Sequence, residues 1–195
     1  MSLNNAPLGL ADEREISWSA VFAGAVVALA VSIVLTILAT GFGFNFAFAG
    51  LPSKSSLATF SPLFGAGSIA VQVLAAGFGG YVAGRLRPHW AYSHADEAHF
   101  RDTAHGLLAW AVSTLAGLVL AVTLLTSYAD QFITPTDTPL IITADAAQRA
   151  ANIAMQAAFF TAFGMILSAF IAAVAARVGG LRNEQMHLRA GERVA

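Results

Sequence analysis

Long apolar stretches alternate with short polar ones along the 195 residues of this chain. A helix that crosses a bilayer needs about 20 mostly apolar residues. Four stretches meet that requirement, at residues 18–42, 62–84, 104–126 and 157–176, and none of them contains a charged residue. A soluble core helix of such length would keep a polar face toward water. The pattern therefore predicts an all-α integral membrane protein, a four-transmembrane-helix bundle that forms one membrane domain over residues 1–195.

The composition agrees with this prediction, because 57% of the residues are apolar and 11% are charged, too few charges for an ordinary soluble domain. The first stretch could instead be a cleaved signal peptide, since Ala47 and Ala49 precede Gly50 as at a cleavage site. A signal peptide has a positive leader and an apolar region of about 7–15 residues. Here acidic residues surround a lone Arg14 and the apolar run is far longer, which favours a membrane helix.

The distribution of basic residues predicts the orientation. Eight of the ten lysines and arginines lie in the leader, in the connection after the second stretch and in the C-terminal segment. Lys and Arg accumulate on the cytoplasmic side of membrane proteins. We therefore expect both termini in the cytoplasm, with cytoplasmic tails at residues 1–15 and 183–195. Residues 43–60 and 127–155 would lie outside.

Small residues recur about every four positions in all four stretches. In lipid, such spacing allows two helix backbones to approach closely, and this contact supplies much of the association energy. The repeat predicts a compact bundle rather than four separate anchors. The helix-packing positions are Gly24, Ala28, Gln72, Gly80, Gly84, Ser113, Gly117, Gly164 and Ser168. We expect Gln72 to bond between helices rather than to bind a substrate.

The segment GGYVAGRLRPHW, residues 79–90, combines glycines with two arginines, a proline and a tryptophan. A dinucleotide-binding loop places its glycines after a strand and before a helix, whereas these glycines end an apolar stretch. The arginine side chains can extend toward lipid phosphates, and tryptophan is enriched at membrane interfaces. We expect lipid-headgroup contacts from Arg85, Arg87, Trp90, Arg177 and Arg182.

The two outer connections differ in character. Residues 42–48 alternate phenylalanine with small or polar residues, which is typical of an interfacial aromatic belt and also fits a short extended segment. In the second connection, Thr143 or Asp145 is a plausible N-cap. A helix from there to residue 177 would be about 50 Å long, so it should project beyond the bilayer or bend near Gly164.

The central connection, HWAYSHADEAHFRDTAHG, holds the residues best suited to chemistry. His94, His99, Asp102 and His105 are ligand types that suit zinc or iron, and three of them step by three along the chain. No H-x-x-x-H or E-x-x-H pattern appears within this connection. We therefore expect no metal site, but a solvated surface loop in which His105 caps or packs at the start of the third helix.

The sequence also lacks residues that several kinds of catalysis and ion transport require. The chain contains no cysteine, which excludes thiolate catalysis, iron–sulfur clusters and covalent haem attachment. Ion pumps usually hold ionisable groups within the membrane. Apart from His105, the four stretches offer Gln72 and scattered serines and threonines but no Asp, Glu, Lys or Arg, and Gln156 lies just before the fourth. We expect no enzyme activity, no cofactor and no nucleic-acid partner.

Three segments carry a resemblance: EISWSAVFAGAVVALAVSIVLTILATGFGF, GGYVAGRLRP and HGLLAWAVSTL. Together they resemble a group of uncharacterised bacterial four-helix inner-membrane proteins, some automatically named PhnA-like, over most of residues 15–126 and less of the rest. The shared motifs are largely membrane-packing patterns. The resemblance implies a bacterial inner (plasma) membrane protein and supplies no catalytic residue, and the residues give no support to the phosphonate chemistry in that name.

Two functional classes follow from these observations. Charge-free helices with many small residues favour a non-catalytic accessory or assembly subunit of a larger membrane complex, or a self-associating scaffold. Its partners would be the lipid bilayer and either other membrane subunits or further copies of itself. The alternative is a small oligomeric channel or transporter, with Gln72, Ser113, Thr114 and Thr161 along a polar path.

Overall fold

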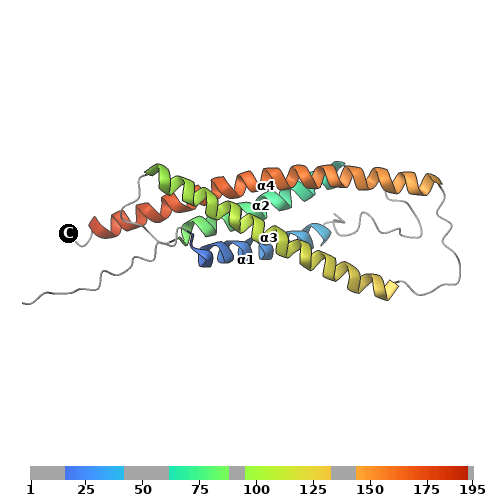
Figure 1. Ribbon diagram of the computed structural model, residues 1–195, viewed down its shortest axis with the longest axis horizontal. Helices are drawn as coiled ribbons and strands as arrows, with labels where there is room; N and C mark the ends of the chain where they lie inside the picture. Colours follow the sequence, from blue (N-terminus) through green and yellow to red (C-terminus); the bar gives the residue numbers. More distant parts are fainter. Residues whose placement is uncertain (1–15, 42–61, 88–94, 133–143, 193–195) are drawn as a thin grey trace, which may run out of the picture.

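A computed structural model describes residues 16–41, 62–87, 95–132 and 144–192 of the chain, and every regular element in these ranges is an α-helix. The helices are α1 (Trp18–Gly41), α2 (Pro62–Arg85), α3 (Ala95–Phe132) and α4 (Ala144–Glu192) (Figure 1). All four are long and apolar enough to cross a membrane. The prediction of four apolar helices is confirmed.

Two helices have the predicted lengths and two are longer. α1 and α2 end within one residue of the predicted stretches, but α3 begins at Ala95 and not near residue 104. The expectation of a surface loop before residue 104 is therefore wrong for residues 95–103, which are helical. α4 contains 49 residues, about 73 Å at 1.5 Å per residue, and is one uninterrupted helix from Ala144. Its C-terminal part includes most of the predicted tail 183–195.

The helices pack around α2 and α3, which contact each other and both of the remaining helices. α2 makes its most extensive contact with α4, and α1 packs against the other side of the pair. Within the described residues, α1 and α4 do not touch. The buried apolar core consists almost wholly of alanines, with Val21 as the exception. Because alanine side chains are short, the helix backbones lie close together.

Adjacent glycines of α2 face different helices. At Gly79, an added Cβ would lie 2.6 Å from the carbonyl oxygen of Gly24 on α1. At Gly80, it would overlap the carbonyl of Ala172 on α4, and at Gly84 that of Ala176. These positions require glycine because backbone atoms occupy the space of a side chain. The pair Gly79–Gly80 thus allows α2 to approach both neighbours at one level.

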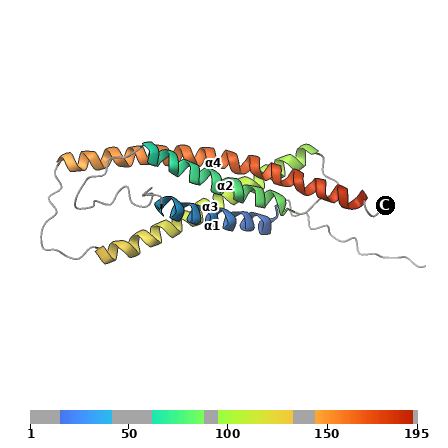
Figure 2. The ribbon, with the colours of Figure 1, turned by 180° about the vertical axis from the view of Figure 1, so that it is seen from behind.

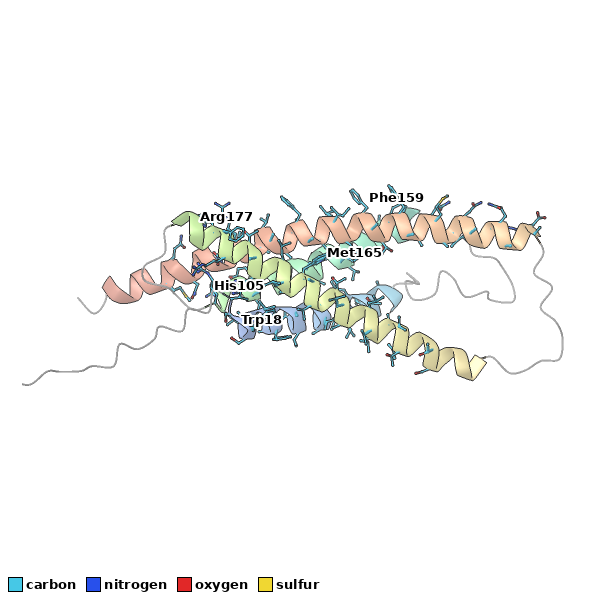
Figure 3. The ribbon with its side chains drawn as sticks, in the orientation of Figure 1. Trp18, His105, Phe159, Met165 and Arg177 are labelled. Carbon is cyan, nitrogen blue, oxygen red and sulfur yellow. The ribbon has the colours of Figure 1, made fainter. Side chains whose placement is uncertain are left out.

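The bundle is closed at one end and open at the other. The C-terminal half of α3 and the N-terminal half of α4 diverge in both views (Figures 1 and 2). Large apolar side chains of this part of α3 are exposed, among them Leu118, Val119 and Leu124. Phe159 of α4 is also exposed and lies along the outer side of that helix (Figure 3). The structure therefore presents apolar surface that its own helices do not cover.

Candidate functional site

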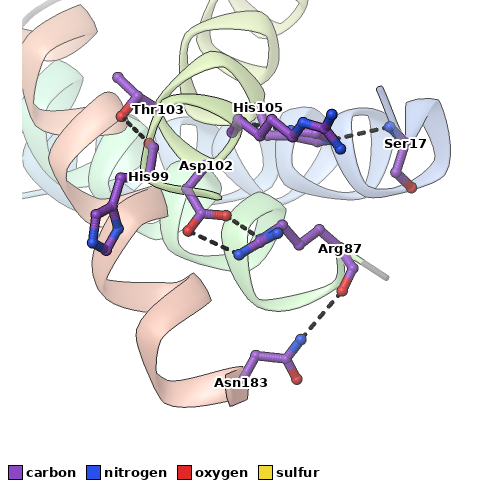
Figure 4. Close-up of polar contacts among 8 residues, drawn as sticks. Ser17, Arg87, His99, Asp102, Thr103, His105 and Asn183 are labelled. Carbon is purple, nitrogen blue, oxygen red and sulfur yellow. Dashed lines mark hydrogen bonds and ion pairs between the residues drawn. The ribbon is translucent and has the colours of Figure 1, made fainter. Parts of the chain in front are cut away.

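Polar side chains gather where the start of α1, the end of α2, the first part of α3 and the last part of α4 meet (Figure 4). We call this cluster the polar junction, and define it as Ser17, Arg87, Asp102, His105 and Asn183. Asp102 and His105 are buried, at 1% and 3% exposure. Buried ionisable groups are costly unless they are paired, so the partners of each one decide what the cluster can do.

Arg87 and Asp102 form the charged pair of the junction. Arg87 Nε and Nη2 both approach the Asp102 carboxylate, and the Nη2–Oδ2 distance is 3.3 Å. Arg87 lies two residues beyond the end of α2, and Pro88 follows it. Because the residue before a proline disfavours helical backbone, α2 ends here and Arg87 leaves the helical path. The pair joins the end of α2 to α3.

His105 links α3 to the start of α1. Its Nε2 lies 2.9 Å from the backbone nitrogen of Ser17, and its Nδ1 lies 2.7 Å from the carbonyl oxygen of Arg101. The Ser17 amide can only donate, so Nε2 must accept and carries no hydrogen. Nδ1 therefore carries the hydrogen and donates to Arg101. His105 is thus held as one neutral tautomer, and it satisfies an amide beside the N-terminus of α1 that has no acceptor within its own helix.

Asn183 and Gly180 of α4 contact the Arg87–Asp102 pair. The Asn183 side-chain amide donates to the Arg87 carbonyl oxygen across 3.2 Å. Three residues earlier on α4, a Cβ added at Gly180 would overlap the Asp102 carboxylate. Glycine at this position therefore leaves the space that the carboxylate occupies. As a result, residues in or beside all four helices contribute to one polar cluster, of which Asp102 and His105 are buried.

Two of the residues that we considered as metal ligands, His105 and Asp102, already have other partners in the structure. Both ring nitrogens of His105 are hydrogen-bonded, and Asp102 is paired with Arg87. Neither side chain can bind a metal ion without breaking these contacts. No group of three His, Asp or Glu side chains suited to a metal ion occurs in the described ranges. His94 lies outside them, and His99 is described but belongs to no such group.

A second polar contact lies deeper among the helices. The Trp110 indole nitrogen donates to the Ser168 hydroxyl across 2.9 Å, and that hydroxyl donates to the Met165 carbonyl oxygen across 3.0 Å. Ser168 is 2% exposed. One turn away along α4, a Cβ added at Gly164 would lie 2.9 Å from the side-chain nitrogen of Gln72. α4 thus receives polar side chains from both α2 and α3.

The arginines predicted at lipid headgroups divide into two groups. Arg177 and Arg182 are exposed on α4, and Arg177 lies along its outer side (Figure 3). Arg85 is half-buried, and its Nη2 lies 3.4 Å from the sulfur of Met186. Arg87 differs from the expectation, because its side chain is 11% exposed and paired with Asp102. A carboxylate within reach holds the guanidinium inside the protein. Trp90 lies outside the described residues.

The predicted packing positions also fall into two groups, those at which helix backbones lie close together and those at which they do not. Gly24 and Ala28 of α1 contact Gly79, while Gly80, Gly84 and Gly164 lie between α2 and α4. Two predicted positions do not bring helix backbones together. The Ser113 hydroxyl donates to the Trp110 carbonyl oxygen of its own helix, and a Cβ added at Gly117 would meet only Leu29, at an ordinary 3.5 Å. The outer half of α3, where Gly117 lies, diverges from α4.

Sequence reasoning missed several positions that the structure brings together. Gly106 is one, since a Cβ there would overlap the Ala172 carbonyl. The Arg87–Asp102 pair is another. A usable signal existed for Asp102, because it lies seven residues before Ala109 and so continues the small-residue face of α3. No comparable pattern marks the contact between Ser17 and His105, which are 88 positions apart.

Comparisons with protein-family models, curated proteins and solved structures gave no match for this chain.

Proposed function

We propose that the chain is a non-catalytic, multi-pass protein of a bacterial inner membrane, with both termini in the cytoplasm. In this proposal it serves as an accessory or assembly subunit of a larger membrane complex, or as a self-associating scaffold. Four helices that are long and apolar enough to cross a membrane support its placement in a bilayer. The clustering of basic residues supports the orientation, with the polar junction at the cytoplasmic end.

The observation that carries the assembly role is the divergence of α3 and α4 (Figures 1 and 2). Only 11% of the most apolar part of α3 is buried inside the chain. Lipid can cover such a surface, but helix association in membranes also proceeds through it when close packing is available. The diverging halves offer two helix surfaces to a further helix. This arrangement suits a subunit whose bundle is completed by a partner.

The hydroxyl groups favour this role over the channel or transporter. A polar path needs donors and acceptors that face the permeating species. Instead, Ser32, Ser68 and Ser113 donate to carbonyl oxygens of their own helices, three residues back in each case. Of the four residues considered for a path, Thr161 is exposed on α4. These three hydroxyls therefore bond within the helices that carry them.

A photocrosslinking experiment tests the assembly role. A photoreactive residue at Leu120, exposed on the diverging half of α3, should give reproducible protein adducts in native membranes. The same residue at Phe170, exposed on the part of α4 that packs against α2, serves as the control and should give mainly lipid adducts. Adducts of twice the chain mass would identify the scaffold, and heterologous adducts would identify the accessory subunit. Lipid adducts alone at Leu120, together with ion flux in liposomes, would favour the channel.

Cysteine labelling tests the orientation. Because the chain has no cysteine, single substitutions report without background. Arg182→Cys lies at the polar-junction end and Asn152→Cys lies on the other side of the apolar part of α4. We expect an impermeant thiol reagent to label Asn152→Cys in intact cells and Arg182→Cys only after lysis. The reverse pattern would contradict the cytoplasmic placement of the junction.

A further inference from the structure

His105 is the one junction residue whose contact depends on a ring nitrogen that can take up a proton. Its Nε2 accepts the Ser17 amide hydrogen at 2.9 Å, which requires that nitrogen to be unprotonated. A proton on Nε2 would place two donors opposite each other. Histidine is the side chain whose unperturbed pKa lies between about pH 5 and pH 8. The contact between the start of α1 and α3 is thus tied to one protonation state.

The surroundings of His105 come from all four helices. Its own helix supplies the Arg101 carbonyl oxygen at 2.7 Å, the charged Arg101 side chain, and Asp102. Among the described residues, the segment after α2 supplies Arg87 as the other nearby charge. α1 supplies the neutral Ser17 amide, and the α4 residues that reach the junction, Gly180 and Asn183, are uncharged. The Arg87–Asp102 pair occupies the only carboxylate of the junction.

Water is the alternative acceptor for the Ser17 amide once His105 no longer accepts, and Ser17 is half-buried. The first hydrogen bond of α1 runs from the Val21 amide to the Ser17 carbonyl oxygen, 3.1 Å apart. Ser17 therefore belongs both to the cap of α1 and to the contact with α3. Loss of the His105 contact frees Ser17, whose carbonyl oxygen accepts the first hydrogen bond of α1.

We propose that His105 is a proton-operated latch: when neutral it holds the start of α1 against α3, and when protonated it releases the first turn of α1. The Arg87–Asp102 pair and the Asn183 contact do not use the Nε2 nitrogen. They keep α2, α3 and α4 together during release. The movement is therefore confined to one end of α1. This inference does not depend on the proposed assembly role.

Distance measurements between two spin labels test the latch in the full chain. Labels at Ser19→Cys and Arg182→Cys, both exposed, report the position of the first turn of α1 relative to α4. Between pH 8 and pH 5 we expect the distance distribution to shift or broaden by about 5 Å, the height of one helical turn. A second pair, Leu38→Cys with Arg182→Cys, reports the other end of α1 and should not change.

Three variants in the labelled background separate the latch from general acid effects. His105→Gln supplies an amide oxygen that accepts at every pH, so its distance should remain closed. Ser17→Pro removes the donated hydrogen, so its distance should be open at both pH values. His99→Gln changes the neighbouring histidine of α3 and should respond like the parent.

Each outcome decides the proposal. A pH response in the parent and in His99→Gln that is absent from His105→Gln supports it. A parent distance that does not change between pH 8 and pH 5 overturns it, as does a normal response in His105→Gln. If His105→Gln does not fold, Ser17→Pro decides alone: a persistent pH response without the donor would overturn the latch. A simultaneous change in the Leu38 pair would indicate acid unfolding and would also overturn it.

Discussion

Substitution by alanine should have opposite effects on stability at Gly80 and at Gly117, because only Gly80 lies in the close contact between α2 and α4. Gly80→Ala adds a Cβ that would overlap the Ala172 carbonyl and lie 2.8 Å from the Ala172 Cα. Both are backbone atoms of a helix, so neither can rotate away. The α2 and α4 backbones must therefore separate by about 1 Å to restore an ordinary contact.

The size of the effect follows from the weaker attraction between the two helices at the larger separation. A gap of about 0.5–1 Å forfeits a quarter to a half of the attraction of each atom pair, and each pair contributes about 0.1–0.2 kcal/mol. If the separation affects about 40 atom pairs, as many as one buried leucine makes, the loss is about 2 kcal/mol. Alanine has a higher helix propensity than glycine and returns up to about 1 kcal/mol. We therefore expect Gly80→Ala to destabilise the bundle by about 1–2 kcal/mol.

Gly117→Ala is the matched control. Its Cβ would meet only the Leu29 Cδ2, at 3.5 Å, so no helix must move and only the gain in helix propensity remains. We expect this variant to be neutral or stabilised by up to about 1 kcal/mol. The measurement is reversible unfolding in mixed micelles, as mild detergent is replaced by a denaturing one. Tryptophan fluorescence and circular dichroism report the transition.

The prediction is tested by whether Gly80→Ala unfolds at a lower denaturing-detergent fraction than Gly117→Ala. If Gly80→Ala and Gly117→Ala shift the unfolding midpoint equally, close backbone contact at Gly80 does not contribute to stability. Gly80→Leu should destabilise more than Gly80→Ala, because the larger side chain forces a wider separation. A Gly80→Leu variant as stable as the parent would refute the same reasoning.

The remaining predictions concern the two buried polar contacts. Asp102→Leu leaves the Arg87 guanidinium without its carboxylate and should cost on the order of 3 kcal/mol, whereas adding Arg87→Met should recover most of that loss; equal unfolding midpoints for the single and double variants would contradict this. Ser168→Ala removes the acceptor of the Trp110 indole and should cost about 1–2 kcal/mol. Ser113→Ala, which removes only a bond to its own helix, should be nearly neutral in the same assay, and a cost equal to that of Ser168→Ala would argue against the indole contact.

Local patterns were enough to predict the number of helices and most of the bounds of α1 and α2. Apolar stretches of sufficient length predict membrane helices because each backbone must satisfy its own hydrogen bonds in lipid. The four-residue spacing of Gly80 and Gly84 likewise predicts one packed face. Both are properties of neighbouring residues on a single helix. The sequence could not assign Gly79 to α1 and Gly80 to α4, because spacing along one helix does not identify its partner.

The extension of α3 shows where local reasoning failed. Charged and imidazole side chains before residue 104 predicted a solvated loop, since such groups favour water over an apolar interior. In the structure, residues 95–105 are helical and Asp102 is buried. Burial is possible because Arg87 supplies the opposite charge and Gly180 leaves the space for the carboxylate. Neither compensation is visible in the segment itself.

The sequence by itself determined four apolar helices and their small-residue faces, because helix length and side-chain periodicity are properties of contiguous residues. Only the tertiary structure decided that Arg87 pairs with Asp102 and that His105 receives the Ser17 amide. These contacts join residues 15 and 88 positions apart. A buried charge or imidazole is stable only when its partner arrives from another helix, so its place depends on how the helices pack.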